Sequence, residues 1–264
     1  MSVRRSIYAD RLNDYADFAF GDEQVFARRG DWRALFFERI GRSYGNRIVL
    51  EIGCFNAAYL CAIANKHPDC AFIGLDWKAK SVHDGAKRVA ESGLKNVALL
   101  RGRAQDLRRI FADCEVDEMW LFHPDPCDRD VELKNRLISE LFLVDVHAIL
   151  RNSTSTLSLK TDHPGYFQWV LSLFGLAEPA WFHAPDAKSP RVRRRDSMTA
   201  ASLPPPSAAV QRRFDVTMNS TDFWNDPAAI AHTECRHFAG ETTLYESRFN
   251  KKRQPIYYFE IRKR

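Results

Sequence analysis

The sequence predicts an α/β protein built on a doubly wound, mostly parallel sheet with helices on both faces. Short apolar runs alternate with segments of helical periodicity along most of the chain, which is the pattern of parallel strands joined by crossover helices. The first run ends just before Gly53, and the second ends in Asp76. The fourth stops abruptly at Pro124-Asp125-Pro126. Polar residues therefore stand at strand ends, where open sheets of this class bind ligands.

Each element follows from a local signal. Apolar, often β-branched runs bounded by turns predict strands, and apolar residues three or four apart predict helices. Gly93 stands where the C-cap of a helix is expected. The expected strands are 47–51, 71–76, 97–101, 118–122, 154–160 and 256–261, and the expected helices are 32–41, 57–65, 81–92, 105–111, 134–150 and 165–174.

Changes in composition predict how the chain is organised. Residues 1–44 are polar and aromatic with several arginines, which is typical of an N-terminal arm and a helix, and residues 45–264 form the α/β domain. Within that domain, residues 185–213 are rich in proline and arginine and lack apolar periodicity, so we expect a mobile surface insertion. Its arginine cluster either holds phosphates or belongs to a solvated linker; it comprises Arg191, Arg193, Arg194 and Arg195.

Bulk composition limits the class of protein. The 264 residues are 45% hydrophobic with a formal net charge of +5, which permits a nucleic-acid partner without requiring one. Six cysteines without a C-x-x-C pair fit a reducing cytoplasm. Neither a secretory signal nor a membrane-spanning run is present, so we expect a cytoplasmic protein without a membrane partner, either monomeric or homodimeric. His232, Cys235 and His237 lack a fourth ligand nearby, so we expect no metal site.

The most informative stretch runs from Trp120 to Arg136. Two prolines make the turn around Asp125 stiff, because each proline fixes its own φ and restricts the residue before it. We therefore expect Asp125 to present a carboxylate on a rigid loop at a strand end. The alternative is a plain Pro-Asp turn in which Asp125 caps the following helix.

A second candidate site lies at the ends of the first two strands. Glu51 and Gly53 precede a helix, and a glycine at such a turn lets a ligand approach the backbone closely. Asp76 ends the next strand, at the position where a carboxylate can accept both hydroxyl protons of a ribose. The alternative is an ordinary βαβ unit with a surface aspartate.

Taken together, these segments resemble the class I methyltransferases that use S-adenosylmethionine, and in particular the tRNA (guanine-N7)-methyltransferase family. The resemblance is carried in order by LEIG, FIGLD, GLKNVALLRG, FHPDPC and KNRL, and then by LKTDHPGYF and TLYESRFNKKRQPIY. It covers residues from about 45 to 175 and from about 240 onward. It implies a Rossmann-like sheet of seven strands in a divergent member of the family.

The resemblance also implies the reaction, which is methyl transfer from S-adenosylmethionine to guanine N7 in the variable loop of tRNA. N7 carries a lone pair, so no proton has to be removed before attack. The site must orient the ring and accommodate positive charge that moves onto guanine, and a fixed carboxylate serves both needs. Asp125 matches the catalytic position. The implied cofactor-binding residues are Glu51, Gly53, Asp76, Ala104 and Asp125, and the implied tRNA-binding residues are Arg129, Lys134, Arg136, Asp162, Thr243, Tyr245 and Glu246.

Two of these residues have a local alternative. Asp162 could instead cap the helix that begins near Pro164, and Glu246 could pair only with Arg248. Both roles would leave the side chain without a substrate.

The chain departs from the family at the cofactor pocket and at the expected tRNA face. The family's Gly-x-Gly-x-Gly loop reads GCFNA at residues 53–57, and its Asp-Ala pair reads Arg103-Ala104. Cys127 replaces a tryptophan, and a basic stretch reads RDVE at 129–132. Phe55 places a ring where the backbone should approach the cofactor, and its Cβ penalises a positive φ. Two other hypotheses therefore stay open: a relative that binds RNA or another ligand without methyl transfer, and a methyltransferase with a different acceptor.

Overall fold

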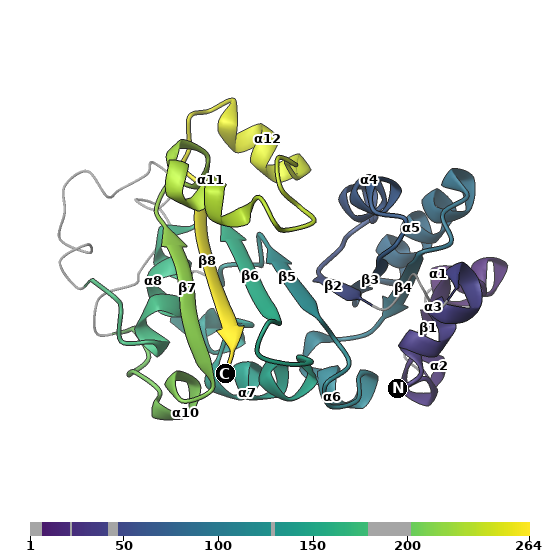
Figure 1. Cartoon of the computed structure of the whole chain (residues 1–264), viewed down its shortest axis with the longest axis horizontal. Helices are drawn as coiled ribbons and strands as arrows, with labels where there is room; N and C mark the ends of the chain where they lie inside the picture. The colour runs from purple at the N-terminus through teal and green to yellow at the C-terminus, as the bar shows by residue number, and fades with distance from the viewer. Residues whose placement is uncertain (1–6, 22, 42–46, 128–129, 179–201) are drawn as a thin grey trace.

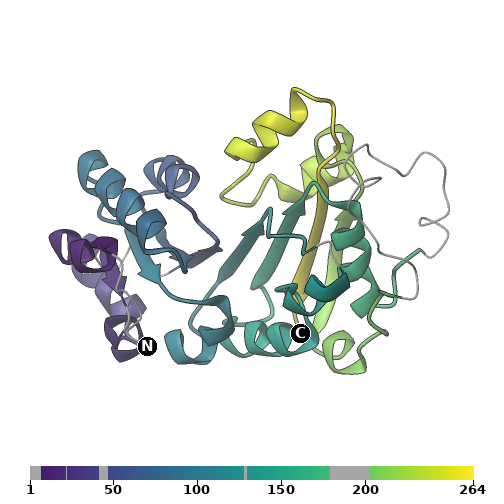
Figure 2. The same cartoon turned by 180° about the vertical axis from the view of Figure 1, so that it is seen from behind.

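The strands form one mixed sheet in the order β1-β4-β3-β2-β5-β6-β8-β7 (Figures 1 and 2). The computed structural model describes residues 7–21, 23–41, 47–127, 130–178 and 202–264. Neighbouring strands from β1 to β6 pair in parallel, whereas β8 is antiparallel to both β6 and β7. The strands are β1 (Ala19–Gly21), β2 (Ile48–Ile52), β3 (Ala71–Asp76), β4 (Val97–Arg101), β5 (Glu118–Phe122), β6 (Thr156–Thr161), β7 (Phe214–Ser220) and β8 (Tyr257–Lys263). The predicted fold class is confirmed.

Helices cover both faces of this sheet. They are α1 (Ile7–Asp10), α2 (Glu23–Ala27), α3 (Trp32–Ile40), α4 (Ala58–Lys66), α5 (Ala79–Ser92), α6 (Leu107–Ile110), α7 (Glu140–Ile149), α8 (Pro164–Leu173), α10 (Ala208–Gln211), α11 (Pro227–Thr233) and α12 (Leu244–Asn250). Four short 3-10 helices are also described, namely η1 (Arg11–Tyr15), η2 (Ala104–Asp106), η3 (Asp130–Asn135) and η6 (Phe223–Asn225). Gly93 ends α5 at a φ of 66°, as the sequence predicts.

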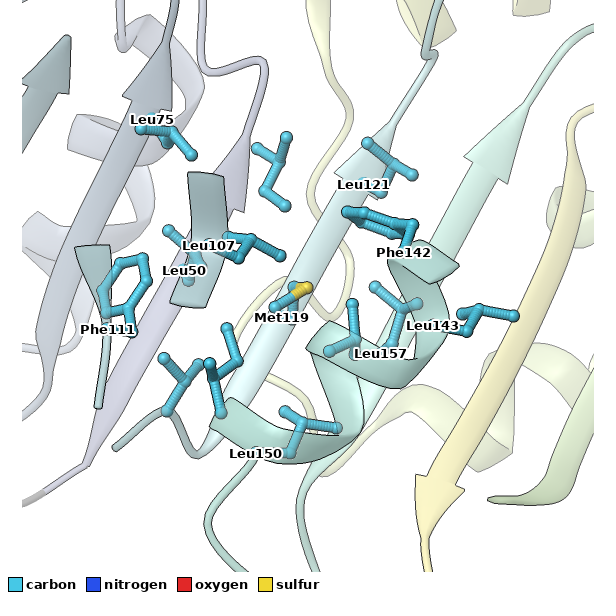
Figure 3. Packing of buried hydrophobic residues seen from close by; sticks show 14 of the residues in the cluster. Leu50, Leu75, Leu107, Phe111, Met119, Leu121, Phe142, Leu143, Leu150 and Leu157 are labelled. Carbon is cyan, nitrogen blue, oxygen red and sulfur yellow. The ribbon is translucent and has the colours of Figure 1, made fainter. Parts of the chain in front are cut away.

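Side chains alternate along the strands, so each face of the sheet has its own core. Leu50 and Met119 pack with α3, α6, α7 and α8 on one face, where Figure 3 shows them among Leu107, Phe142 and other large apolar side chains. Trp120, next in sequence to Met119, belongs to the core on the other face, under α4, α5 and α12. Burying one such side chain stabilises the fold by about 1.5–3 kcal/mol. These two layers hold the strand ends, and therefore the site, in a fixed arrangement.

The sheet has one strand more than the seven that the family resemblance implies. The extra strand, β1, comes from the segment predicted as an arm, and it pairs with β4, with Ala19 opposite Leu99. Its three residues form no β-branched run, so the usual strand signal is missing. The Tyr8 and Tyr15 rings also pack edge-on against His83 of α5. The domain boundary at residue 44 stays a prediction, although the described part of this segment completes the sheet edge.

Two other expectations need correction. The helix predicted over residues 134–150 begins only at Glu140, because the Ser139 side chain caps it by accepting a hydrogen bond from the Phe142 N–H. Residues 185–201 of the predicted insertion lie outside the described residues. Residues 202–213 are packed rather than free on the surface: Val210 is fully buried, and the Ser207 hydroxyl donates to Glu140 at 2.7 Å.

Candidate active site

A pocket of about 400 Å³ opens at the carboxyl ends of β2, β3, β4 and β5. Four of the predicted site residues line it together, namely Gly53, Asp76, Ala104 and Asp125. The loops after β2, β3 and β4 line one side of the pocket, which we call the β2–β4 side, and the loop after β5 lines the other. We call the region formed by the loops after β5 and β6 together with α12 the β5–β6 side; its residues after β6 and on α12 lie beside the pocket and are not part of its lining. Figure 1 shows α11 and α12 at the edge where β5 and β6 end.

Asp125 stands on an exposed, braced turn directly after β5. Its Oδ1 accepts a hydrogen bond from the Cys127 N–H at 3.2 Å, and Cys127 has a φ of 45°. The Arg136 side chain donates to the Pro126 carbonyl at 2.7 Å. The Asp125 carboxylate thus stabilises its own turn, as in the alternative of a plain Pro-Asp turn, and it also lines the pocket.

Arg136 lies inside the protein instead of on a tRNA-facing surface. It is only 3% exposed. Its guanidinium lies 5.3 Å from the Tyr166 ring and 5.0 Å from the Trp169 ring, and it also donates to the Gly165 carbonyl. A guanidinium used in this way is unavailable to a phosphate, so the structure supports a role for Arg136 in bracing the Asp125 turn.

Two carboxyl groups define the β2–β4 side. Asp76 accepts hydrogen bonds from the backbone N–H groups of Lys78 at 2.8 Å and Phe55 at 3.1 Å. Burial still raises the pKa of Asp76 above its usual value. Behind the pocket wall, Glu51 is 6% exposed, and its Oε2 has no hydrogen-bond partner among the described residues. Burial, and secondly the charge of Asp76, raise the pKa of Glu51 to about 8. Glu51 is therefore mostly protonated at neutral pH.

The loop after β2 keeps a glycine-type backbone although two glycines are missing. Gly53, Phe55 and Ala57 all have a positive φ, at 78°, 50° and 53°. Each Cβ in this conformation costs roughly 1–2 kcal/mol. The Phe55 side chain is 53% exposed and is absent from the pocket lining. The expected backbone strain is therefore present, and whether the Phe55 ring takes the cofactor's place stays a prediction.

On the β5–β6 side, Asp162 follows β6 and is partly exposed. Its Oδ1 lies 3.5 Å from Nδ1 of His123, whose side chain is 5% exposed. Asp162 does not cap α8, because the His163 side chain does so by accepting from the Tyr166 N–H at 3.0 Å. Tyr245 is 48% exposed, and its ring lies 5.9 Å from that of His123.

Thr243 and Glu246 are both buried, and they form the capping box of α12. Glu246 also makes an ion pair of 2.9 Å with Lys160, and neither side chain is exposed. Burial alone would raise the pKa of Glu246, but the Lys160 ammonium outweighs it, so the pKa lies below its usual value and the carboxylate stays charged. Four aromatic rings surround the Lys160 ammonium at 4.5 to 5.2 Å, those of Phe122, Phe223, Trp224 and Phe238. Glu246 therefore does not pair only with Arg248, and any role of this pair toward tRNA stays a prediction.

The remaining predicted residues are placed only in part. Lys134 is exposed on η3. Arg129 and the four arginines at 191–195 lie outside the described residues. Within the described ranges, no group of three or more His, Cys, Asp or Glu side chains is arranged to hold a metal. A membrane span needs both length and continuous hydrophobicity, and no helix in the described part of the chain combines the two.

Among the pocket-lining residues that sequence reasoning missed are Trp77 and His123. Trp77 is 60% exposed and has the Arg103 guanidinium 6.0 Å from its ring. His123 lies between β5 and the Pro-Asp-Pro turn. Both residues directly follow a strand that ends at the pocket, and this position in the sequence could have identified them.

The fold and the pocket define a class I methyltransferase. Two solved structures share the fold: an antibiotic-related methyltransferase (13% identity, TM-score 0.50, covering 87% of this chain and 92% of that one) and the antibiotic-resistance methyltransferase Kmr (13% identity, TM-score 0.51, covering 88% and 92%). Residues 45–193 match a family model described as "Putative methyltransferase". At this level of identity the solved structures support the fold alone.

Sequence relatives identify the family more closely. The tRNA (guanine-N(7)-)-methyltransferase of Christiangramia forsetii is 35% identical over 151 residues, which is 57% of this chain and 65% of that protein. The enzyme of the same name from Geobacillus kaustophilus is 31% identical over 172 residues, 65% of this chain and 75% of that protein. The chain belongs to the tRNA (guanine-N7)-methyltransferase family.

Proposed function

We propose that this protein transfers the methyl group of S-adenosylmethionine to N7 of a guanine in tRNA. The observation that carries the proposal is the position of Asp125. Its exposed carboxylate lines one pocket together with Gly53, Asp76 and Ala104, on a turn braced by Arg136. The names of the relatives support tRNA as the substrate. We place the activity in the cytoplasm, since all six cysteines are free thiols.

The residues of the β2–β4 side fit the cofactor. An added Cβ at Gly53 would meet no atom within 4 Å, so the backbone there borders open space. Asp76 uses two backbone donors to fix its carboxylate, and a carboxylate has about four acceptor positions, which leaves room for ribose hydroxyls. Ala104 and Trp77 offer apolar surface to a base. The unpartnered Oε2 of Glu51 lies next to this wall.

Asp125 and its turn supply the chemistry expected of the protein. S-adenosylmethionine, when bound, supplies an electrophilic methyl group. The Asp125 carboxylate can accept hydrogen bonds from the donor edge of guanine and so align N7 with the pocket. The same charge stabilises the positive guanine product. Its rigid mounting means that little reorganisation is needed as that charge develops.

The test is methylation of bulk tRNA with labelled S-adenosylmethionine, followed by nuclease digestion and mass spectrometry for 7-methylguanosine. We expect wild-type protein to form this nucleoside. Asp125→Asn should lose at least about a hundredfold in rate while keeping its unfolding temperature, because the side chain is exposed. Asp69→Asn is the matched control, since Asp69 is an exposed aspartate after Pro68 at the opposite end of β3, and it should behave like wild type.

Other outcomes would favour the remaining hypotheses. Calorimetry that shows no binding at millimolar S-adenosylmethionine would favour a relative that binds RNA without methyl transfer. Label that appears only on protein or small molecules would favour a different acceptor. Full activity of Asp125→Asn would remove Asp125 from the catalytic role.

A further inference from the structure

His123 lies in the pocket wall, and the proposed function gives it no role. Its ring is almost fully buried, and neither ring nitrogen has a hydrogen bond within the described part of the chain. Asp162 Oδ1 lies 3.5 Å from its Nδ1. A buried imidazole without hydrogen bonds is costly, which suggests that its place serves a purpose other than stability.

The ring is held firmly in this place. His123 has a φ of 52°, a conformation that is uncommon for a residue with a side chain and that occurs often at active sites. Its N–H donates to the Lys160 carbonyl at 2.7 Å, which ties it to β6. The ring packs against Tyr245 at 5.9 Å and Phe249 at 5.8 Å, both on α12. Three elements therefore fix the imidazole beside Asp162.

We propose that His123 is a positioning residue for methyl transfer: it holds the Asp162 carboxylate on the β5–β6 side, beside the pocket. This proposal rests on the proposed function. A neutral imidazole carries one N–H. An N–H that points at Asp162 fixes the tautomer of the imidazole, and it orients the carboxylate without cancelling its charge.

The orientation of Asp162 matters because methyl transfer moves positive charge onto guanine. Asp162 faces His123 from the loop after β6, Glu246 and Tyr245 face it from α12, and Asp125 follows on its own loop. Lys160 already pairs with Glu246. Asp162, 3.5 Å from the imidazole, is the carboxylate that a His123 N–H can orient, and its negative charge can then stabilise the charge that develops on the base.

The first experiment compares kcat and KM for tRNA, at saturating S-adenosylmethionine, in wild type, His123→Gln and His123→Phe. Glutamine keeps a neutral N–H donor, so KM should stay near wild type. His123→Phe has no donor, so its KM should rise about tenfold. His147→Gln, on α7 against Phe214, is the matched control and should keep the wild-type KM.

A second readout does not depend on activity. Nitrogen-15 NMR of the free protein should show a His123 Nδ1–H resonance that is protected from water, and Asp162→Ala should abolish it. Equal KM values for wild type and both His123 variants, or no protected resonance, would overturn the proposal. Wild-type protein that methylates no tRNA would overturn the proposed function instead, and the resonance would still decide whether His123 holds Asp162.

Discussion

The β2–β4 side of the pocket is shaped by backbone, whereas the β5–β6 side is shaped by buried side chains. On the β2–β4 side, three residues with positive φ form the loop after β2, and the carboxyl group of Glu51 has an oxygen without a partner. On the β5–β6 side, Lys160 and Glu246 neutralise each other in an aromatic enclosure, and α12 is fixed by its capping box. The first side has acceptor atoms available, and the second has satisfied most of its charges internally.

This difference indicates which kind of sequence change each side tolerates. A loop defined by backbone can lose glycines and keep its path, at the cost of strain, because Phe55 can point its ring outward. A wall defined by a dry ion pair cannot lose one partner cheaply, because the other charge would stay buried. Departures from the family fall in loops of the first kind at residues 55, 57 and 103, and further departures follow β5 at residues 127 and 129–132.

The largest effect is expected from breaking the Lys160–Glu246 pair. Lys160→Met leaves Glu246 charged and buried, which should lower the free energy of unfolding by about 3–5 kcal/mol. Adding Glu246→Gln should restore most of it, since glutamine is neutral and can still accept from the Thr243 N–H. Urea unfolding measures the free energy of unfolding of the single and the double variant.

Lys87→Met is the control, because Lys87 pairs with Glu91 on the exposed face of α5, and it should cost at most about 0.5 kcal/mol. A loss below about 1 kcal/mol for Lys160→Met would show that water reaches this side, and the contrast between the two sides would fail.

A smaller effect is expected at Glu51, through pH. Its pKa is raised to about 8 in the folded protein from an ordinary 4.5, so the folded state binds the proton more tightly than the unfolded chain. Stability should be greatest below the ordinary pKa and fall as pH rises toward 8. Glu51→Gln removes this dependence and should gain about 3 kcal/mol over wild type at pH 8. Thermal unfolding from pH 5 to 8.5 tests this, and parallel curves for both proteins would contradict it.

The smallest effect is expected in the loop after β2. Phe55→Gly should stabilise the protein by about 0.5–1 kcal/mol, because the relief of a positive φ outweighs the entropy of glycine. Affinity for S-adenosylmethionine should change by less than about twofold, since the backbone already has its path and the Phe55 ring is not in the pocket lining.

Phe55→Leu separates the ring from the Cβ, and it should leave both stability and affinity near wild type. A tenfold gain in affinity for Phe55→Gly by calorimetry would show instead that the ring does obstruct the cofactor.

The sequence predicts the central strands well because their signals are local. β3, β4 and β5 begin and end where the apolar runs do, and the pocket gathers Gly53, Asp76 and Asp125 because parallel strands end at one edge. The missed features depend on tertiary contacts. β1 is a strand only because β4 offers an open edge. Arg136 is buried against Gly165, and Glu246 pairs with Lys160. Both contacts join residues far apart in sequence, so no local sequence pattern predicts them.

The position of β8 inside the sheet has a consequence for the order of assembly. β8 is the last strand described along the chain, yet it lies between β6 and β7. The loops of the β2–β4 side come from residues made early in synthesis and paired with near neighbours, so they can form while translation continues. β7 can join the sheet only after β8 has been made. A ribosome-bound nascent chain that ends before β8 would thus contain every residue that lines the pocket, while β7 would still lack the strand with which it pairs.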